Sequence, residues 1–219
     1  MNDLVNLSAR TMVELLRKHE ITPVEAVDAA INRIAEVDGA VNALPTVAAE
    51  RAHAHASKLM EIGQPEGVPP RGYLYGLPVA IKDLKDVEGV RSTKGSPIFA
   101  NHIPDKSDYL VENIEAHGGI VLAKSNTPEF GAGANTFNEV FGKTRNPWDT
   151  SKTCGGSSGG SAVALATGEV WLATGSDLGG SLRIPASFCS VVGMRPSPGR
   201  VPHGPKDMPF ATLSVEGPM

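Results

Sequence analysis

The sequence has few aromatic residues, no excess of positive charge and no long apolar run. Phe, Trp and Tyr make up 5% of its 219 residues, and the net charge is -4. A cationic stripe for phosphate backbones is therefore lacking, which argues against direct binding of nucleic acid. No apolar run approaches the roughly 18 residues of a membrane span, and the N-terminus lacks the apolar core of a signal peptide. These absences predict a cytoplasmic protein without a membrane partner.

Cysteine is equally scarce. Cys154 and Cys189 lie far apart, and the sequence contains neither a CxxC motif nor a His cluster at zinc spacing. We expect both thiols to be reduced and structural, and we expect no metal site. Glycine and proline are plentiful by contrast, with 24 and 17 residues. This composition is typical of a compact, loop-rich globular protein.

Helix and strand signals alternate along the chain. Thr22-Pro23-Val24-Glu25 is a capping box with proline at the first helical position, and apolar residues follow at helical spacing. The patterns predict helices over 8–18, 23–36, 46–61, 107–117 and 161–168, and strands over 77–81, 120–123 and 169–175. Residues 63–72 form a linker, and 125–156 a long loop. The succession predicts a single α/β domain, with a helical N-terminal segment over 1–65 and a catalytic core over 66–219.

Two clusters rich in serine and glycine stand out: CGGSSGGS at 154–161 and SDLGGS at 176–181. A phosphate-binding loop is the first function to test, because glycines expose backbone N–H groups. Gly142-Lys143-Thr144 supplies the end of a P-loop motif, but Phe137 stands where glycine is needed. GAGANT at 131–136 lacks the last glycine of a dinucleotide fingerprint and follows no strand. Both nucleotide-binding interpretations are therefore weak.

The first cluster also matches GxSxG twice, centred on Ser157 and on Ser158. An α/β-hydrolase places this motif directly after a buried strand. Here the preceding residues, RNPWDTSKTC, are polar and contain proline, and only His203 lies downstream as a triad histidine. A histidine-based triad is therefore disfavoured.

A serine can also be activated by a lysine, provided that the amine is neutral. Burial at the end of an apolar strand lowers the pKa of a lysine, and both Lys82 and Lys124 stand at such positions. The residue pattern alone does not choose between them. In the second cluster, successive N–H groups could point at a developing oxyanion. These donors belong to Leu178, Gly179, Gly180 and Ser181.

The stretch GGSSGGSAVALATGEVWLATGSDLGGSLRIPASFCSVVGMRPSPGRVP at 155–202 closely resembles the signature of the amidase signature family of serine hydrolases. LPVAIKDLKDVEGV resembles the family's lysine segment, and GGIVLAKSNTPEFG resembles its second strand and loop. The resemblance covers nearly the whole chain. It implies an amidase-signature fold, with a mixed central sheet covered by helices on both faces.

The resemblance also implies a Ser-cisSer-Lys triad. Lys82 matches the base, Ser157 matches the serine on a cis peptide, and Ser181 matches the nucleophile. Lys124 matches a position outside the triad.

Three further residues are expected to support the site. Ser158 is expected to hydrogen-bond the lysine, whereas Asp177 and Arg183 are expected to brace the loop around the nucleophile.

The implied function is an amidohydrolase that cleaves a linear amide of a small molecule through an acyl-enzyme on Ser181, without metal or cofactor. The alternative is the glutaminase-type subunit of a tRNA-dependent amidotransferase, which releases ammonia from glutamine. Those subunits usually carry Gln after the motif arginine, whereas this chain has Ile184, which favours a hydrolase.

Family members are about twice as long as this chain, which stops at SVEGPM. We therefore expect a piece of a longer or two-chain protein, whose partner is the C-terminal half or a second copy. A non-catalytic binding module is the third possibility.

Overall fold

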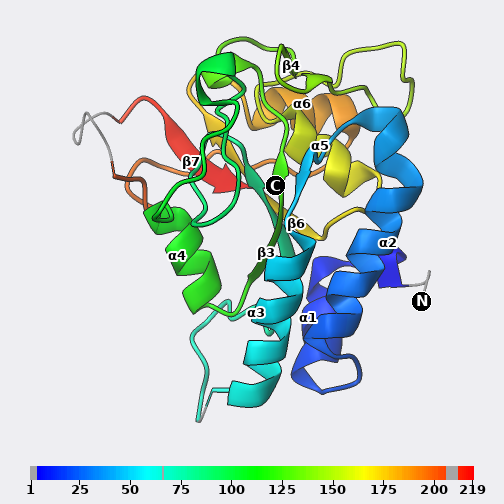
Figure 1. The fold of residues 1–219 in the computed structure, drawn as a ribbon, viewed down its shortest axis with the longest axis vertical. Helices are drawn as coiled ribbons and strands as arrows, with labels where there is room; N and C mark the ends of the chain where they lie inside the picture. Colours follow the sequence, from blue (N-terminus) through cyan, green and yellow to red (C-terminus); the bar gives the residue numbers. More distant parts are fainter. Residues whose placement is uncertain (1–3, 66, 206–211) are drawn as a thin grey trace.

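The computed structural model describes residues 4–65, 67–205 and 212–219 (Figure 1). Residue 66 of the predicted linker and the first three residues of the predicted N-terminal segment lie outside the described residues. A five-stranded sheet in the order β1-β3-β2-β6-β7 forms the centre of the molecule. Strands β2, β3 and β6 are parallel, whereas β1 and β7 pair antiparallel at the two edges. The bounds are β1 Thr46–Val47, β2 Pro78–Lys82, β3 Ile120–Ser125, β6 Leu172–Asp177 and β7 Val215–Pro218.

In the described residues, six α-helices surround the sheet: α1 Ala9–Arg17, α2 Pro23–Val41, α3 Ala49–Ile62, α4 Tyr109–Ala116, α5 Gly159–Ala166 and α6 Arg183–Cys189. The predicted capping box is confirmed at the start of α2. Thr22 N–H donates to Glu25 Oε2 at 2.8 Å, and Glu25 N–H donates to Thr22 Oγ1 at 3.2 Å. The helix continues beyond the predicted end and stops at Asn42, which adopts a left-handed conformation (φ 56°).

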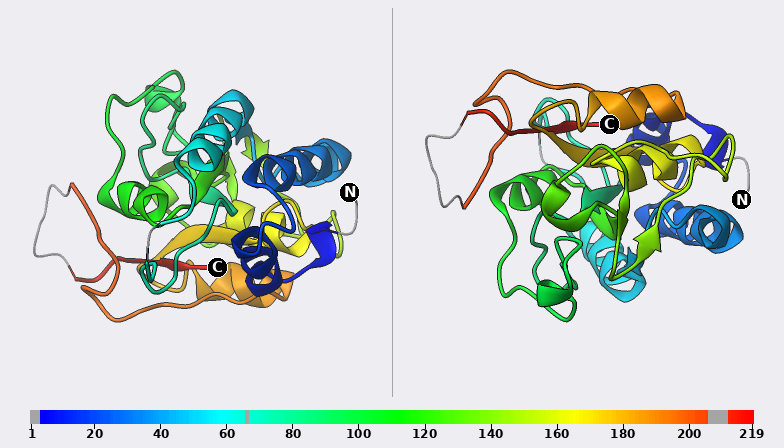
Figure 2. Two further views of the ribbon diagram at one scale, coloured as in Figure 1. Left: turned by 90° about the horizontal axis from the view of Figure 1, so that it is seen from below. Right: turned by 90° about the horizontal axis from the view of Figure 1, so that it is seen from above.

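Alternate residues of the central strands pack against helices on opposite faces of the sheet. Ala80 and Leu122 belong to the main core, to which α1, α2, α3, α5 and α6 all contribute. Val79 and Ile81 face the other way and pack in a smaller cluster with Val111 of α4. Figure 2 shows α4 on one side of the sheet and α6 on the other. The predicted mixed sheet with helices on both faces is therefore confirmed.

Several short elements escaped prediction. The predicted loop over 125–156 contains a 3-10 turn and a hairpin of β4 Phe137–Asn138 and β5 Gly142–Lys143. Strands β1 and β7 and helix α6 have two, four and seven residues, which is too short for a hydrophobic period to be recognised. No helix in the described part of the chain has the length and apolarity that crossing a bilayer requires.

Both cysteines are buried free thiols, as expected. Burial raises the pKa of Cys154 to about 11 and that of Cys189 to about 12. The thiolate form is therefore disfavoured at both positions, which fits a structural role.

Glu169, in the turn between α5 and β6, is a buried acid that makes stability depend on pH. Its side chain is fully buried and accepts a hydrogen bond from Thr167 Oγ1 at 2.6 Å. Burial raises its pKa from the ordinary value of 4.5 to about 8. The folded state therefore retains a proton that the unfolded chain loses, and the free energy of unfolding decreases as pH rises between these two values.

We expect Glu169→Gln to raise Tm at pH 8 by about 2–4 °C or more, and to leave Tm nearly unchanged at pH 4. Thermal unfolding followed by circular dichroism at both pH values measures this difference. Glu61→Gln, which changes an exposed acid in the same way, is the control. An equal effect of Glu169→Gln at both pH values would contradict the assignment.

Candidate active site

Lys82, at the carboxyl end of β2, is surrounded by serine hydroxyls. Its side chain is fully buried, and Nζ lies 2.7 Å from Ser157 Oγ, 2.9 Å from Ser158 Oγ and 2.9 Å from Ser176 Oγ. Burial lowers the pKa of Lys82 to about 7, and the negative charge of Glu216 opposes that shift. The amine can therefore be neutral near pH 7, as a proton acceptor must be.

Ser157 and Ser158 immediately precede α5. The peptide bond between Gly156 and Ser157 is cis, as the resemblance implies. Tight packing explains one nearby glycine, because a Cβ atom on Gly160 would lie 2.3 Å from the backbone nitrogen of Asn126. The first cluster of glycines thus lets the start of α5 approach the end of β3 closely.

Ser158 joins the two serine clusters. Its N–H donates to the carbonyl of Ser181 at 3.2 Å, and its Oγ accepts from the N–H of Ser176 at 3.2 Å. Glycine at position 175 makes room for Ser158, because a Cβ atom on Gly175 would lie 2.8 Å from Ser158 Oγ. Tertiary structure therefore brings together two segments that α5 and β6 separate in the sequence.

Ser181 lies in the turn between β6 and α6 and is partly exposed. A partly exposed serine beside a buried lysine–serine pair is accessible to a substrate while its neighbours are shielded from water. Of the three predicted triad residues, Lys82 and Ser157 are in direct contact. Ser181 is held next to them by the hydrogen bond that its backbone carbonyl accepts from the N–H of Ser158.

Asp177 organises the turn that carries Ser181. Its side chain is fully buried and accepts hydrogen bonds from the N–H groups of Gly180 and Leu182 and from the guanidinium of Arg183. Burial alone would raise the pKa of Asp177, but these hydrogen bonds lower it to about 2. Arg195, which sequence analysis missed, lies 3.2 Å from the same carboxylate. No spacing in the sequence points to Arg195, because it follows α6 in an irregular segment.

The geometry changes one prediction about the oxyanion donors. Gly180 N–H points at Asp177 Oδ1, at 2.8 Å, and so it braces the turn instead of facing a substrate. The N–H groups of Leu178, Gly179 and Ser181 donate no hydrogen bond within the described residues. The predicted set of four donors is thus reduced to three.

Lys124 occupies a separate buried cluster. Its Nζ lies 2.7 Å from Asp83 Oδ1 and donates to the carbonyl of Lys85 and to Ser92 Oγ, both at 2.7 Å. Burial lowers the pKa of Lys124, whereas Asp83 raises it. Lys124 therefore holds the segment after β2 in place, through contacts with Asp83, Lys85 and Ser92.

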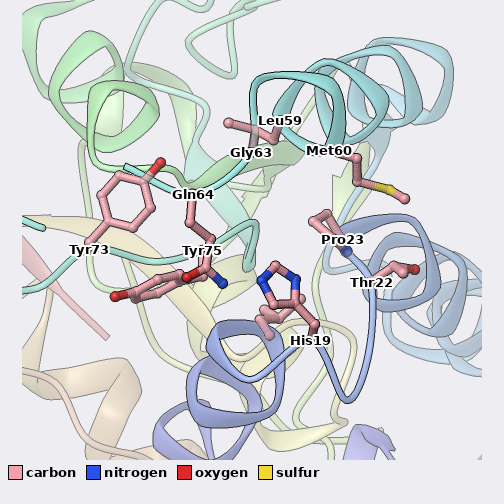
Figure 3. Close-up of a pocket in the computed structure, with 10 residues that line it drawn as sticks. His19, Thr22, Pro23, Leu59, Met60, Gly63, Gln64, Tyr73 and Tyr75 are labelled. Carbon is pink, nitrogen blue, oxygen red and sulfur yellow. The ribbon is translucent and has the colours of Figure 1, made fainter. Parts of the chain in front are cut away.

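Two other candidates from the sequence are found at β5 and beside β7. Gly142 and Lys143 form β5 of the hairpin, and His203 lies 3.7 Å from Glu216 on β7. A cavity of about 160 Å³ opens between the N-terminal helices (Figure 3). His19, Tyr73 and Tyr75 are among the residues that line it, and none of Lys82, Ser157 and Ser181 does. This cavity is therefore separate from the candidate active site.

Comparison with known proteins places the chain in a family. The model of the family Amidase matches residues 25–219. One subunit of the glutamyl-tRNA(Gln) amidotransferase of Moorella thermoacetica is 44% identical over 199 residues, which are 91% of this chain and 40% of that protein. The chain thus spans well under half the length of this relative.

Two solved structures share the fold. A 6-aminohexanoate cyclic dimer hydrolase complexed with substrate matches with a TM-score of 0.87 and 33% identity, over 98% of this chain and 43% of that one. A bacterial aryl acylamidase of the amidase signature family matches with the same TM-score and identity, over 97% and 44%. Together with the family match, these likenesses show that the chain belongs to the amidase signature family.

Proposed function

We propose that this chain carries the catalytic residues of an amide-hydrolysing enzyme, with Ser181 as nucleophile. The contact of 2.7 Å between Lys82 Nζ and Ser157 Oγ carries the proposal. A fully buried lysine whose pKa is about 7 is suited to accept a proton from a serine.

The proposed reaction begins with a proton relay. Neutral Lys82 takes the proton of Ser157, Ser157 takes the proton of Ser181, and Ser181 Oγ bonds to the amide carbonyl carbon. The tetrahedral oxyanion is stabilised by the N–H groups of Leu178, Gly179 and Ser181. The relay then runs in reverse, the C–N bond breaks and the amine leaves with the proton. Water hydrolyses the resulting ester on Ser181 and releases the acid.

Two substrate classes compete within this proposal. The curated relatives favour the glutamine amide, because the Moorella relative and others at 39% to 45% identity are named as the same subunit of glutamyl-tRNA(Gln) amidotransferases. These relatives support the alternative from sequence analysis better than a free-standing amidase that acts on linear amides. Ile184, in place of the usual Gln, and the two hydrolase structures favour the amidase. We infer a glutaminase-type subunit first and a free-standing amidase second.

Labelling with a fluorophosphonate, which reacts with activated serines, tests the proposed nucleophile. We expect one label per chain, located on Ser181 by peptide mapping. A label found only on another serine, or no label at any pH between 6 and 9, would contradict the proposal.

Ammonia release separates the two substrate classes. The protein is assayed with glutamine, alone and with the other subunits of an amidotransferase, and with a panel of linear and cyclic amides. Release from glutamine that increases when the other subunits are added would support the glutaminase-type subunit. Hydrolysis of the amide panel without any partner would support the free-standing amidase.

A further inference from the structure

A buried cluster of charged side chains lies beside Lys82 and takes no part in the proton relay. Glu216 of β7 is 3% exposed, and its Oε1 lies 3.1 Å from Nζ of Lys85. The same Nζ lies 3.3 Å from Oδ2 of Asp108, just before α4. Buried ion pairs contribute little net stability, because desolvation offsets their attraction. Stability alone therefore gives no reason for this cluster to stand next to the lysine.

The cluster is connected to Lys82 from two directions. Lys85 follows β2 in a tight turn, and its N–H donates to the carbonyl of Lys82 at 3.0 Å. Glu216 is the cross-strand partner of Ser176, whose Oγ is hydrogen-bonded to Lys82 Nζ at 2.9 Å. Since paired residues on neighbouring strands project from the same face of a sheet, the Glu216 side chain lies next to the Ser176 side chain whose hydroxyl contacts Lys82.

We propose that Glu216 is a positioning residue that sets the pH range in which Lys82 acts as a base, and that Lys85 holds its carboxylate in place. The inference rests on the proposed function of Lys82. Burial favours the neutral amine, and an amine that is too weakly basic cannot take a proton from serine. A negative charge at Glu216 restores part of the proton affinity that burial removes.

The charges around the pair act in known directions. Burial has the largest effect on the pKa of Lys82 and lowers it. The negative charges of Glu216 and Asp177 raise this pKa, and the positive charge of Lys85 lowers it. Burial raises the pKa of Glu216, whereas Lys85 and Lys82 lower it. The other charged or titratable groups that face the cluster are Asp86, Asp108, His203 and the pair of Asp83 with Lys124.

The test compares Glu216→Gln, which removes the charge, with Glu216→Asp, which retains it. Lysine labelled with ¹³C at Cε is titrated by NMR, and the Lys82 signal is assigned with a Lys82→Arg variant. In Glu216→Gln we expect the titration midpoint of Lys82 to fall by about one pH unit or more, because the negative charge of Glu216 is lost while the positive charge of Lys85 remains. In Glu216→Asp we expect a midpoint close to that of the wild type. Glu112→Gln, on the exposed face of α4, is the control for the change in net charge.

The rate of Ser181 labelling provides a second readout. Its half-maximal pH is expected to fall in Glu216→Gln together with the Lys82 midpoint. A purely structural role would lower Tm in both Glu216 variants and leave both midpoints unchanged, which would overturn the inference. If Ser181 is never labelled, the proposed function fails, but the NMR midpoints still decide whether Glu216 acts on Lys82.

If Glu216→Gln does not fold, a titration of the wild-type protein tests whether Glu216 and Lys82 interact. The side-chain carboxyl carbon of Glu216, labelled with ¹³C, is expected to show an inflection at the same pH as the Cε signal of Lys82, since each group senses the charge of the other. A Glu216 carboxyl signal that is unchanged through the Lys82 midpoint would overturn the inference.

Discussion

Ser181→Ala is expected to abolish turnover and leave the fold intact. Without its hydroxyl there is no atom to form the acyl-enzyme, and removing the nucleophile of a serine hydrolase typically lowers kcat by about 10³-fold or more. The fold should survive because Ser181 is partly exposed and contributes its backbone carbonyl, not its side chain, to the bond with Ser158. Turnover of the best substrate found, together with a thermal melt, measures both effects.

The control for this variant is Ser187→Ala. Ser187 is exposed on α6, six residues further along the chain, and its substitution by alanine changes the composition in the same way. It should retain full turnover. A Ser181→Ala protein that still hydrolyses its amide would refute the assignment of the nucleophile, whatever its stability.

Lys124→Met is expected to destabilise the protein by about 3–5 kcal/mol. The substitution leaves Asp83 as a buried carboxylate without its cation, because the Nζ of Lys124 is 2.7 Å from Asp83 Oδ1 and both side chains are almost fully buried. Hydrogen bonds from Thr93 to Asp83 remain, but they do not replace the lost positive charge. The free energy of unfolding in urea at pH 8 measures the loss.

Lys82→Met is the matched comparison, since it removes the other fully buried lysine in the same way. Among the described residues, no carboxylate is in direct contact with Lys82, and a lysine with a pKa of about 7 is mostly neutral at pH 8. Its replacement should therefore cost much less stability while abolishing the labelling of Ser181. Equal stability losses in the two variants would contradict the separate roles that we assign to the two lysines.

Much of the architecture follows from local sequence signals. The capping box at Thr22 and the apolar runs that form β2 and β3 predicted those elements, because hydrogen bonds at a helix end and hydrophobic periods operate over a few neighbouring residues. The helix between the serine clusters was recognised for the same reason. Helix α6 and strand β7 have no such local signal, and pairing with β6 is what makes residues 215–218 a strand.

For the site, residue order established which residue types are present and that glycine allows two serine segments to approach each other. It left Lys82 and Lys124 equivalent at the ends of two apolar strands, and a family resemblance was needed to choose between them. The folded chain distinguishes them by their contacts, with serine hydroxyls around one lysine and a carboxylate beside the other. Folding also placed Arg195 on Asp177, directed Gly180 N–H at Asp177, and paired Glu216 with Ser176, whose hydroxyl contacts Lys82. Such contacts join residues far apart in the chain, and electrostatic effects depend on distance and burial, which residue order does not specify.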